Sequence, residues 1–384
     1  MFPIPQPLID QRLFILIAML VVWAGRARRA TRTRLKVRNL DPKTVKAPVR
    51  EKVSVIVPAR NEEKNIGECL EGLLHQDAAD LEIIVADDNS TDETAEILKS
   101  FSDRVRVVQV PPTPRGWTGK NFAVHTAVAH ATGDWYLFTD ADTRHESSSV
   151  SCALAHASAR AVELLTLLPR CIARGFVEKL IQPTAMGFLG LWFPFEKVNQ
   201  PKSREVFGNG QFLLIRRELY GRLGGHEAVR QEFLEDYALV RKAKAAGAKI
   251  ECAFGIRLYG TRMYDSFTAI WRGWRRIYLH AFEQKPLTLA LRALSVLFFS
   301  VVPFLALIPL AISAYVKHSQ IAQGLLAAEA SLLLLIWIIA WQTYGLIRAQ
   351  RLYALLHPLA AVVVGMILLD ASIMAATKQE TKWR

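Results

Sequence analysis

Three long apolar blocks in the last quarter of the chain constrain its fold most strongly. They cover residues 294–316, 325–346 and 352–376, and each exceeds the roughly 20 apolar residues that a helix needs to cross a bilayer. Because a segment inside a bilayer must satisfy its backbone polar groups internally, we expect each block to form a membrane-spanning helix. The link from Arg348 to Arg351 between the last two blocks is basic, which is typical of a cytoplasmic loop.

A shorter apolar run extends from Leu13 to Trp23. It has only about half the length of a straight span, so it either crosses the membrane as an N-terminal anchor or lies on its surface as an interfacial helix. Most of the positive charge follows this run, whereas a cleaved signal peptide carries its charge in front. We therefore expect an uncleaved anchor whose C-terminal flank is cytoplasmic.

The next segment, residues 26–52, is strongly basic. It carries eleven lysines and arginines against two carboxylates, Asp41 and Glu51, in a chain whose formal net charge is +13. Such a run suits anionic lipid headgroups or phosphates, and an arm that binds nucleic acid is the alternative interpretation. Because positive charge next to an apolar run is typical of membrane proteins, we expect a bilayer as the partner and no nucleic acid.

Between Val53 and about Ala253, short apolar strands alternate with helical patterns. The expected strands are Val53–Val57, Leu81–Val85, Val105–Val110 and Trp135–Thr139, and the expected helices are Glu62–Leu74, Thr91–Leu98 and Asn121–Ala131. This alternation is typical of βα units around a mostly parallel sheet, so the expected fold class is α/β with additional transmembrane helices. We predict four parts: an anchor at 1–25, a basic linker at 26–52, an α/β domain at 53–285 and a membrane domain at 286–384.

Asp87 and Asp88 directly follow the expected strand at 81–85. Open α/β sheets bind ligands at the carboxyl ends of their strands, where a carboxylate can accept the ring N–H of a uracil-like base or the ribose hydroxyls. Asp88 is the stronger candidate for this role and Asp87 the next. The alternative is that the segment only caps the following helix, since short oxygen-bearing side chains accept the free N–H groups of a helix start.

Asp140 and Asp142 follow the expected strand at 135–139. Two carboxylates at positions i and i+2 of an extended segment lie on the same side, so both can bind one hard cation together with diphosphate oxygens. A divalent metal there would neutralise the charge that develops on a departing nucleotide diphosphate.

Glu235 and Asp236 stand in an otherwise apolar segment, near Gly224, Gly225 and His226. A carboxylate at a helix start can act as a general base toward an acceptor hydroxyl during displacement at an anomeric carbon. The alternative interpretation is an exposed acidic pair that only starts a helix.

Two basic segments are candidates for phosphate contacts. Lys120 ends a glycine-bearing loop ahead of a helix, where it could reach a phosphate or a sugar; a plain surface loop is the alternative. Arg272, Arg275 and Arg276 lie among aromatic residues just before the membrane blocks. Arginine suits bidentate phosphate contacts and aromatic rings suit the headgroup level, so this segment clamps a diphosphate, anchors the chain at the interface, or does both.

These motifs together resemble family 2 glycosyltransferases with the GT-A fold. Val53–Arg60, Ala86–Asp92, Thr139–Asp142 and Glu235–Asp236 stand in the order and approximate spacing of that family, and the resemblance covers about residues 53–282. It implies an inverting hexosyltransferase with a Rossmann-like catalytic domain. It also implies a nucleotide-sugar donor, with a UDP-sugar such as UDP-glucose expected, and a divalent Mg²⁺ or Mn²⁺.

The resemblance implies a role for each matching position. Asp236 would be the catalytic base with Glu235 beside it, and Asp140 and Asp142 would hold the metal. The donor-binding residues would be Pro58, Arg60, Glu62, Asp87, Asp88, Lys120, Asp140, Arg272, Arg275 and Arg276. In one respect the chain departs from the family: processive members carry Gln-x-x-Arg-Trp before a membrane helix, whereas the run that ends at Arg276 has no tryptophan in the last slot. This departure argues against a synthase of long polymers.

The segments 116–121, 207–212 and 224–226 look most like the branch of this family that acts on carotenoids and hopanoids. The resemblance therefore implies a membrane-lipid acceptor with a hydroxyl or carboxyl group. It also implies a multi-pass protein of a bacterial-type cell membrane with its catalytic domain in the cytoplasm. The apolar stretch from Phe176 to Phe195 is the candidate for lipid entry at the membrane interface, and core packing is the alternative.

Two other functions fit the same sequence. A polyprenyl-phosphate sugar synthase would share the donor motifs, but its accepting phosphate needs no general base. A non-catalytic membrane scaffold or sugar-nucleotide sensor would keep the fold, although all the expected carboxylates are present in this chain. Glu329 and Asp370 lie inside the apolar blocks, where ionisable groups are costly, and the sequence assigns neither a role.

Overall fold

The computed structural model describes all residues except 1–5, 45–49, 79, 318–319 and 379–384. The described chain forms two compact units. The α/β unit comprises the described residues within 35–172 and 193–263, and the helical unit comprises those within 1–34, 173–192 and 264–381. The predicted boundaries at residues 25, 52 and 285 stay a prediction.

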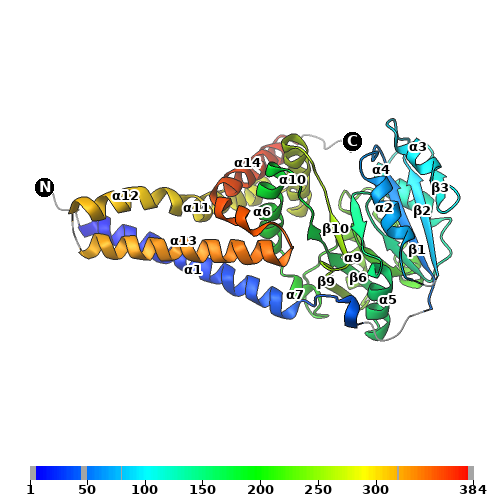
Figure 1. Cartoon of the computed structure of the whole chain (residues 1–384), viewed down its shortest axis with the longest axis horizontal. Helices are drawn as coiled ribbons and strands as arrows, with labels where there is room; N and C mark the ends of the chain where they lie inside the picture. Colours follow the sequence, from blue (N-terminus) through cyan, green and yellow to red (C-terminus); the bar gives the residue numbers. More distant parts are fainter. Residues whose placement is uncertain (1–5, 45–49, 79, 318–319, 379–384) are drawn as a thin grey trace. The chain divides into compact units, whose positions relative to one another are not determined.

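A seven-stranded, mostly parallel sheet forms the centre of the α/β unit (Figure 1). In spatial order its strands are β3 (Arg106–Gln109), β2 (Leu81–Asp87), β1 (Val53–Ala59), β4 (Trp135–Phe138), β8 (Leu213–Arg216), β6 (Leu164–Leu168) and β9 (Ile250–Phe254). β8 pairs antiparallel with both neighbours, and the other pairs are parallel. The predicted fold class is confirmed, and each of the four predicted strands exists within two residues of its expected ends.

A small second sheet includes the strand that directly follows Asp140 and Asp142, the predicted metal ligands. It consists of β5 (Thr143–His145), β10 (Tyr259–Thr261) and β7 (Arg170–Cys171), in that order with β10 in the centre. Thr143 pairs with Thr261 in this sheet. Because β5 begins directly after Asp142, this pairing fixes the backbone that leaves the motif.

The helices of the α/β unit follow the predicted pattern with shifted starts. They are α2 (Ile66–Leu74), α3 (Thr94–Lys99), α4 (Gly119–Val128), α5 (Ser149–Ala159), α7 (Phe195–Val198), α8 (Arg217–Arg222) and α9 (Glu235–Ala245). α4 starts two residues earlier than predicted because the hydroxyl of Thr118 accepts the N–H of Asn121 and caps the helix. α2 starts four residues later, because the Asn65 side chain donates to the Glu62 carboxylate and helps to hold a turn there.

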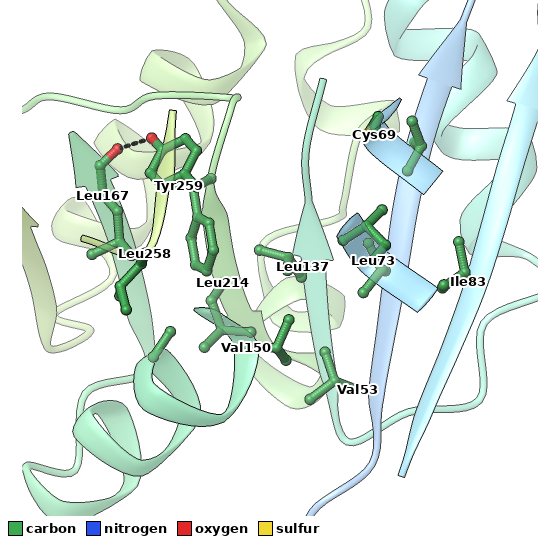
Figure 2. Close-up of a cluster of buried hydrophobic side chains, with 14 of the residues drawn as sticks. Val53, Cys69, Leu73, Ile83, Leu137, Val150, Leu167, Leu214, Leu258 and Tyr259 are labelled. Atoms are coloured by element: carbon green, nitrogen blue, oxygen red, sulfur yellow. Dashed lines mark hydrogen bonds between the residues drawn. The ribbon is translucent and has the colours of Figure 1, made fainter. Parts of the chain in front are cut away.

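One apolar cluster joins the sheet to its helices (Figure 2). Leu73, Leu137 and Leu214 contribute to it from α2, β4 and β8, and all three side chains are fully buried. Burying one such leucine stabilises the fold by about 1.5–3 kcal/mol. The cluster therefore holds the strands whose ends carry the candidate site.

The helical unit contains most of α1 (Gln6–Lys36) together with α6 (Phe176–Trp192) and the C-terminal helices. The latter are α10 (Phe267–Ala281), α11 (Pro286–Ser300), α12 (Val302–Lys317), α13 (Gln320–Leu346) and α14 (His357–Ala376). Three helical segments in the described residues are long and apolar enough to cross a membrane: Pro286–Val316, Gln320–Leu346 and Arg351–Ala376. They correspond to the three predicted blocks, and the chain is membrane-associated.

Exposed apolar side chains on α12 agree with this assignment. Leu305, Ile308 and Ile312 are 63%, 64% and 59% exposed, and such a row suits contact with lipid tails.

The Leu13–Trp23 run lies within α1, which is not among the three candidate spans of the described chain. The choice between an anchor and an interfacial helix at this run stays a prediction.

Most of the stretch proposed for lipid entry forms α6 and belongs to the helical unit, whereas residues 193–195 belong to the α/β unit. Leu180, Ile181 and Phe188 are buried there, whereas Phe176 is exposed. Much of the stretch therefore packs within the helical unit, as the alternative interpretation expects, and its role in lipid entry stays a prediction.

Candidate active site

The C-terminal ends of β1, β2 and β4 lie together at one edge of the parallel sheet. Ala59 is in register with Asp87, and Ile56 with Phe138. Asp140 follows β4 by two residues. The carboxylates that the sequence placed after two different strands therefore share one edge, where open α/β sheets bind ligands.

Lys120 is the central cation of the site. Its Nζ lies 2.8 Å from Oδ1 of Asp140 and 2.7 Å from Oε1 of Glu235. Burial disfavours the charged ammonium, but Asp140, Glu235 and Asp236 outweigh that cost and raise the pKa of Lys120 well above its usual value. Lys120 is thus a permanent positive charge that links the metal motif to the start of α9.

Asp236 is a carboxyl held by two backbone N–H groups. Its Oδ2 accepts the N–H of Gly210 at 2.6 Å, and its Oδ1 accepts the N–H of Tyr237 at 2.7 Å. Burial, and then the negative charge of Glu235, raise the pKa of Asp236 to about 7. A carboxylate with a pKa near neutrality is well suited to take a proton at physiological pH.

Two glycines let the backbone approach this carboxylate. A Cβ on Gly208 would lie 2.6 Å from the carbonyl oxygen of Asp236, and a Cβ on Gly210 would lie 3.3 Å from the Lys120 ammonium. Asn209 between them donates to the carbonyl of Leu167 and to the hydroxyl of Tyr259. The segment 207–212, which the sequence singled out only by resemblance, therefore holds Asp236 in place.

Asp142 lies where a cation would relieve electrostatic strain. Its Oδ1 accepts a hydrogen bond from the Thr261 hydroxyl at 3.3 Å. Burial, and then the charges of Asp140 and Glu62, raise the pKa of Asp142 to about 8. In the described part of the chain, no group of three or more His, Cys, Asp or Glu side chains could hold a metal ion. A divalent ion here would need further oxygens from diphosphate or water, and Mg²⁺ commonly binds in this way.

The loop after β2 is organised by short hydrogen bonds. Asp87 accepts the N–H and the hydroxyl of Ser90 at 3.1 and 2.6 Å. Ser90 lies before α3, which starts at Thr94, so Asp87 holds the loop and does not cap that helix. Asp88 is buried and pairs with Arg60 at 3.2 Å. Two of the donor-binding candidates, Arg60 and Asp88, thus contact each other directly.

A pocket opens among these residues. Its lining consists of Pro58, Lys120, Val124, Phe138, Thr139, Asp140, Gly210, Leu213, His226, Glu235, Asp236 and Leu239, around about 300 Å³ of empty space that is partly open to solvent. Five of the predicted site residues thus meet in one cavity.

His226 also lines this pocket, and no role was predicted for it from the sequence. Its Nδ1 lies 2.8 Å from the Tyr220 hydroxyl. Burial, and then the charge of Lys120, lower its pKa to about 3, so the ring is neutral. The preceding Gly225 has φ +56°, and a Cβ there would lie 2.7 Å from the Tyr220 ring. The glycine pair before His226 was the available signal for this packing.

Arg272, Arg275 and Arg276 lie on α10 in the helical unit. There Arg275 donates to the carboxylate of Asp370 at 3.0 Å, and Trp271 donates to the same oxygen at 2.7 Å. Asp370, which the sequence left without a role, is therefore a partner of this segment. The donor-binding roles of the three arginines stay predictions.

Comparison with known proteins agrees with the geometry. Residues 54–224 match the model of glycosyl transferase family 2. The 4,4'-diaponeurosporenoate glycosyltransferase of Staphylococcus aureus strain USA300 is 28% identical over 228 residues, and that of strain MRSA252 is 29% identical over 229 residues. Each match covers 58% of this chain and 60% of the relative, so the chain spans about three fifths of these relatives' length.

One solved structure is similar over almost the whole chain. The mannosyltransferase of Pyrobaculum calidifontis in complex with GDP-Man and Mn²⁺ superimposes with a TM-score of 0.51, at 21% identity, over 95% of this chain and 99% of that one. This likeness shows the fold. Residues 54–224 are therefore similar to a family 2 glycosyltransferase domain, and the chain has a GT-A fold.

Proposed function

We propose that the chain is an inverting glycosyltransferase that moves a sugar from a nucleoside-diphosphate donor to a hydroxyl or carboxyl group of a membrane lipid. One observation carries this proposal: a pocket at the C-terminal edge of the sheet is lined by Asp236, whose pKa is about 7, and by Lys120 with its partners Asp140 and Glu235. The relatives named for transfer to diaponeurosporenoate and the three candidate spans support a lipid acceptor. The sugar that best fits the resemblance is glucose, carried by UDP.

The donor would lie along the sheet edge. Asp87 and Asp88 would contact its nucleoside, and the Lys120 ammonium would contact its diphosphate. Asp140 and Asp142 would hold Mg²⁺ or Mn²⁺, because both carboxylates lie at this edge and the raised pKa of Asp142 marks a place that favours a cation. Such an ion would supply positive charge to the leaving diphosphate.

Asp236 would remove the proton of a hydroxyl acceptor. The acceptor oxygen forms a bond to the anomeric carbon while the bond from that carbon to the diphosphate oxygen breaks, so one displacement inverts the configuration. Glu235 stays bound to Lys120, and its negative charge keeps the proton affinity of Asp236 high. Gly210 and Tyr237 orient the carboxylate through their N–H groups.

Sugar transfer in membranes tests this proposal. Membranes that contain the full chain are given radiolabelled nucleotide sugars, with and without EDTA, and the label in the organic extract is counted. We expect metal-dependent label that an Asp236→Asn variant loses by at least about 100-fold, the lower range for a general base. The matched control is Glu232→Gln, since Glu232 is an exposed carboxylate that pairs only at the surface with Arg241.

Each other result has a defined meaning. An Asp236→Asn variant that keeps its activity would point to an acceptor that is already ionised, such as a polyprenyl phosphate. Nucleotide binding without transfer from any donor would contradict the enzymatic proposal and favour a sensor or scaffold.

We also propose that the α/β unit lies in the cytoplasm of a multi-pass protein. The basic link between Arg348 and Arg351 and the basic segment at 26–52 support this orientation, because cytoplasmic flanks of spans carry an excess of lysine and arginine.

A further inference from the structure

Three arginines of the helical unit converge between α1 and α11. Arg26 donates to the hydroxyls of Ser295 and Ser300, on α11, at 3.3 and 3.4 Å. Arg29 lies one turn further along α1, and it interacts electrostatically with Arg292, which lies three residues before Ser295. Residues three apart share one face of a helix, so the three guanidinium groups face the same seam between the two helices.

No carboxylate balances this charge in the described chain. Arg26 bonds only to hydroxyls, and Arg29 donates only to the carbonyl of Leu191. Arg292 makes its contacts with aromatic rings. Like charges held together without a counter-ion cost free energy, and an anion bound from outside the chain would remove that cost.

Aromatic rings fix two of the three cations. The guanidinium carbon of Arg26 lies 4.6 Å from the centroid of the Trp23 ring, and that of Arg292 lies 5.5 Å from the centroid of Trp192. Cation–π contacts of this kind hold the planar guanidinium group in a defined position, unlike the guanidinium group of a freely moving surface arginine.

A buried imidazole without a partner lies next to the same tryptophan. The ring of His357 is 6.0 Å from that of Trp23, centroid to centroid, and it interacts electrostatically with Arg26. The residue is 6% exposed, and its Nε2 has no hydrogen-bond partner in the described structure. An acceptor oxygen from a ligand would satisfy it.

We propose that Arg26, Arg29 and Arg292 form a binding site for the phosphate group of an anionic phospholipid. Arg292 lies near the start of the candidate span Pro286–Val316, so the cluster sits at a span end, where lipid phosphates are found and long side chains reach them. A phosphate diester offers several oxygens to three arginines, and arginine forks match phosphate geometry. The site does not depend on the proposed sugar transfer, since it uses none of the pocket residues.

Native mass spectrometry of the full chain in detergent tests this site. The protein is titrated with phosphatidylglycerol, with phosphatidylcholine, with oleate as a carboxylate amphiphile, and with inorganic phosphate as a competitor. We expect phosphatidylglycerol to bind at least about tenfold more tightly than phosphatidylcholine or oleate, and a millimolar excess of inorganic phosphate to leave it bound. The Arg26→Gln/Arg292→Gln variant should lose about tenfold or more of this affinity, the range for hydrogen bonds to charged groups.

Arg28→Gln is the matched control, because Arg28 is an exposed arginine of the same helix. If Arg28→Gln weakens binding as much as the double variant, or if oleate or phosphatidylcholine binds equally well, the proposed site is wrong. Displacement by inorganic phosphate would overturn the lipid as the ligand. Should the double variant not fold, Arg29→Gln removes an exposed side chain that donates one hydrogen bond, to the carbonyl of Leu191, in the described chain. Its effect on phosphatidylglycerol affinity then decides the question.

Discussion

At the scale of single residues, the site is built around one lysine and two adjacent carboxylates that differ in their environment. Glu235 is neutralised by Lys120, whereas Asp236 receives backbone N–H groups and keeps a pKa of about 7. A carboxyl whose pKa is shifted toward neutrality is common at catalytic sites. The sequence predicted Glu235, Asp140 and Lys120 separately, but no local pattern shows that Lys120 joins the other two. That contact depends on the fold, because it links residues far apart in the chain.

The first residue-scale prediction concerns pH. Transfer to a hydroxyl acceptor should fall about tenfold per pH unit below a pH of about 7, because Asp236 must be ionised and its pKa is raised to about 7. The same shift lowers stability as the pH rises: the contribution of this carboxyl is fully present below its unfolded pKa of about 4 and is lost between there and a pH of about 7. Initial rates at saturating donor between pH 5.5 and 9 measure the first effect. A rate that stays constant down to pH 5.5 would exclude Asp236 as the base.

The second residue-scale prediction concerns Lys120. Lys120→Met leaves Asp140 and Glu235 without their shared cation, and removing one partner of a buried ion pair typically costs about 3–5 kcal/mol of unfolding free energy. We expect a lowered midpoint in thermal unfolding and loss of transfer. Adding Glu235→Gln should recover part of the stability, since it removes one uncompensated charge. Lys242→Met, at an exposed lysine of α9, should change neither property.

At the scale of elements, the strands were predictable, but the segment that holds Asp236 was not. β1, β2 and β4 are short apolar runs that end in polar residues, so pattern and composition locate them. The segment 207–212 has no regular pattern, and its importance comes from the close approach of its backbone to α9. The start of α2 was predicted too early, because side-chain hydrogen bonds in a turn compete with the first helical turn.

Gly208→Ala tests this element. The added Cβ would lie 2.6 Å from the carbonyl oxygen of Asp236, so the two backbones must separate. We expect at least about a tenfold loss of transfer and a destabilisation of about 1–3 kcal/mol, the usual range for overpacking. Gly221→Ala on α8 is the control, because nothing lies within 4 Å of its Cβ position. There alanine should stabilise the helix by about 0.5–1 kcal/mol. Wild-type activity in Gly208→Ala would show that the contact is not needed.

At the scale of the whole molecule, the sequence predicted an α/β part and three C-terminal spans, and both are present. It did not separate the segment 173–192 from the α/β part, although this segment belongs to the helical unit. The physical reason is that an apolar helix has the same sequence pattern whether it packs in a soluble core or beside other membrane helices. Only contacts between distant parts of the chain distinguish the two.

The membrane orientation gives a prediction at this scale. All four native cysteines are buried, so labelling by a membrane-impermeant maleimide should report an introduced cysteine. Gln350→Cys, in the link between the second and third candidate spans, should react in inverted vesicles and not in intact cells. Tyr315→Cys, near the C-terminal end of the candidate span Pro286–Val316, should react in intact cells and not in inverted vesicles. Both positions are exposed. Labelling of Gln350→Cys from outside the cell would reverse the proposed orientation.

The hydrogen bonds around Asn209 have a wider consequence. The Tyr259 hydroxyl donates to Leu167 on β6 and accepts from Asn209, and the next residue, Gly210, holds the Asp236 carboxylate. The proposed base is thereby tied to the sheet through a tyrosine that does not line the pocket. Replacing that tyrosine would shift the working pH of the proposed transferase while every residue that lines the pocket stays the same.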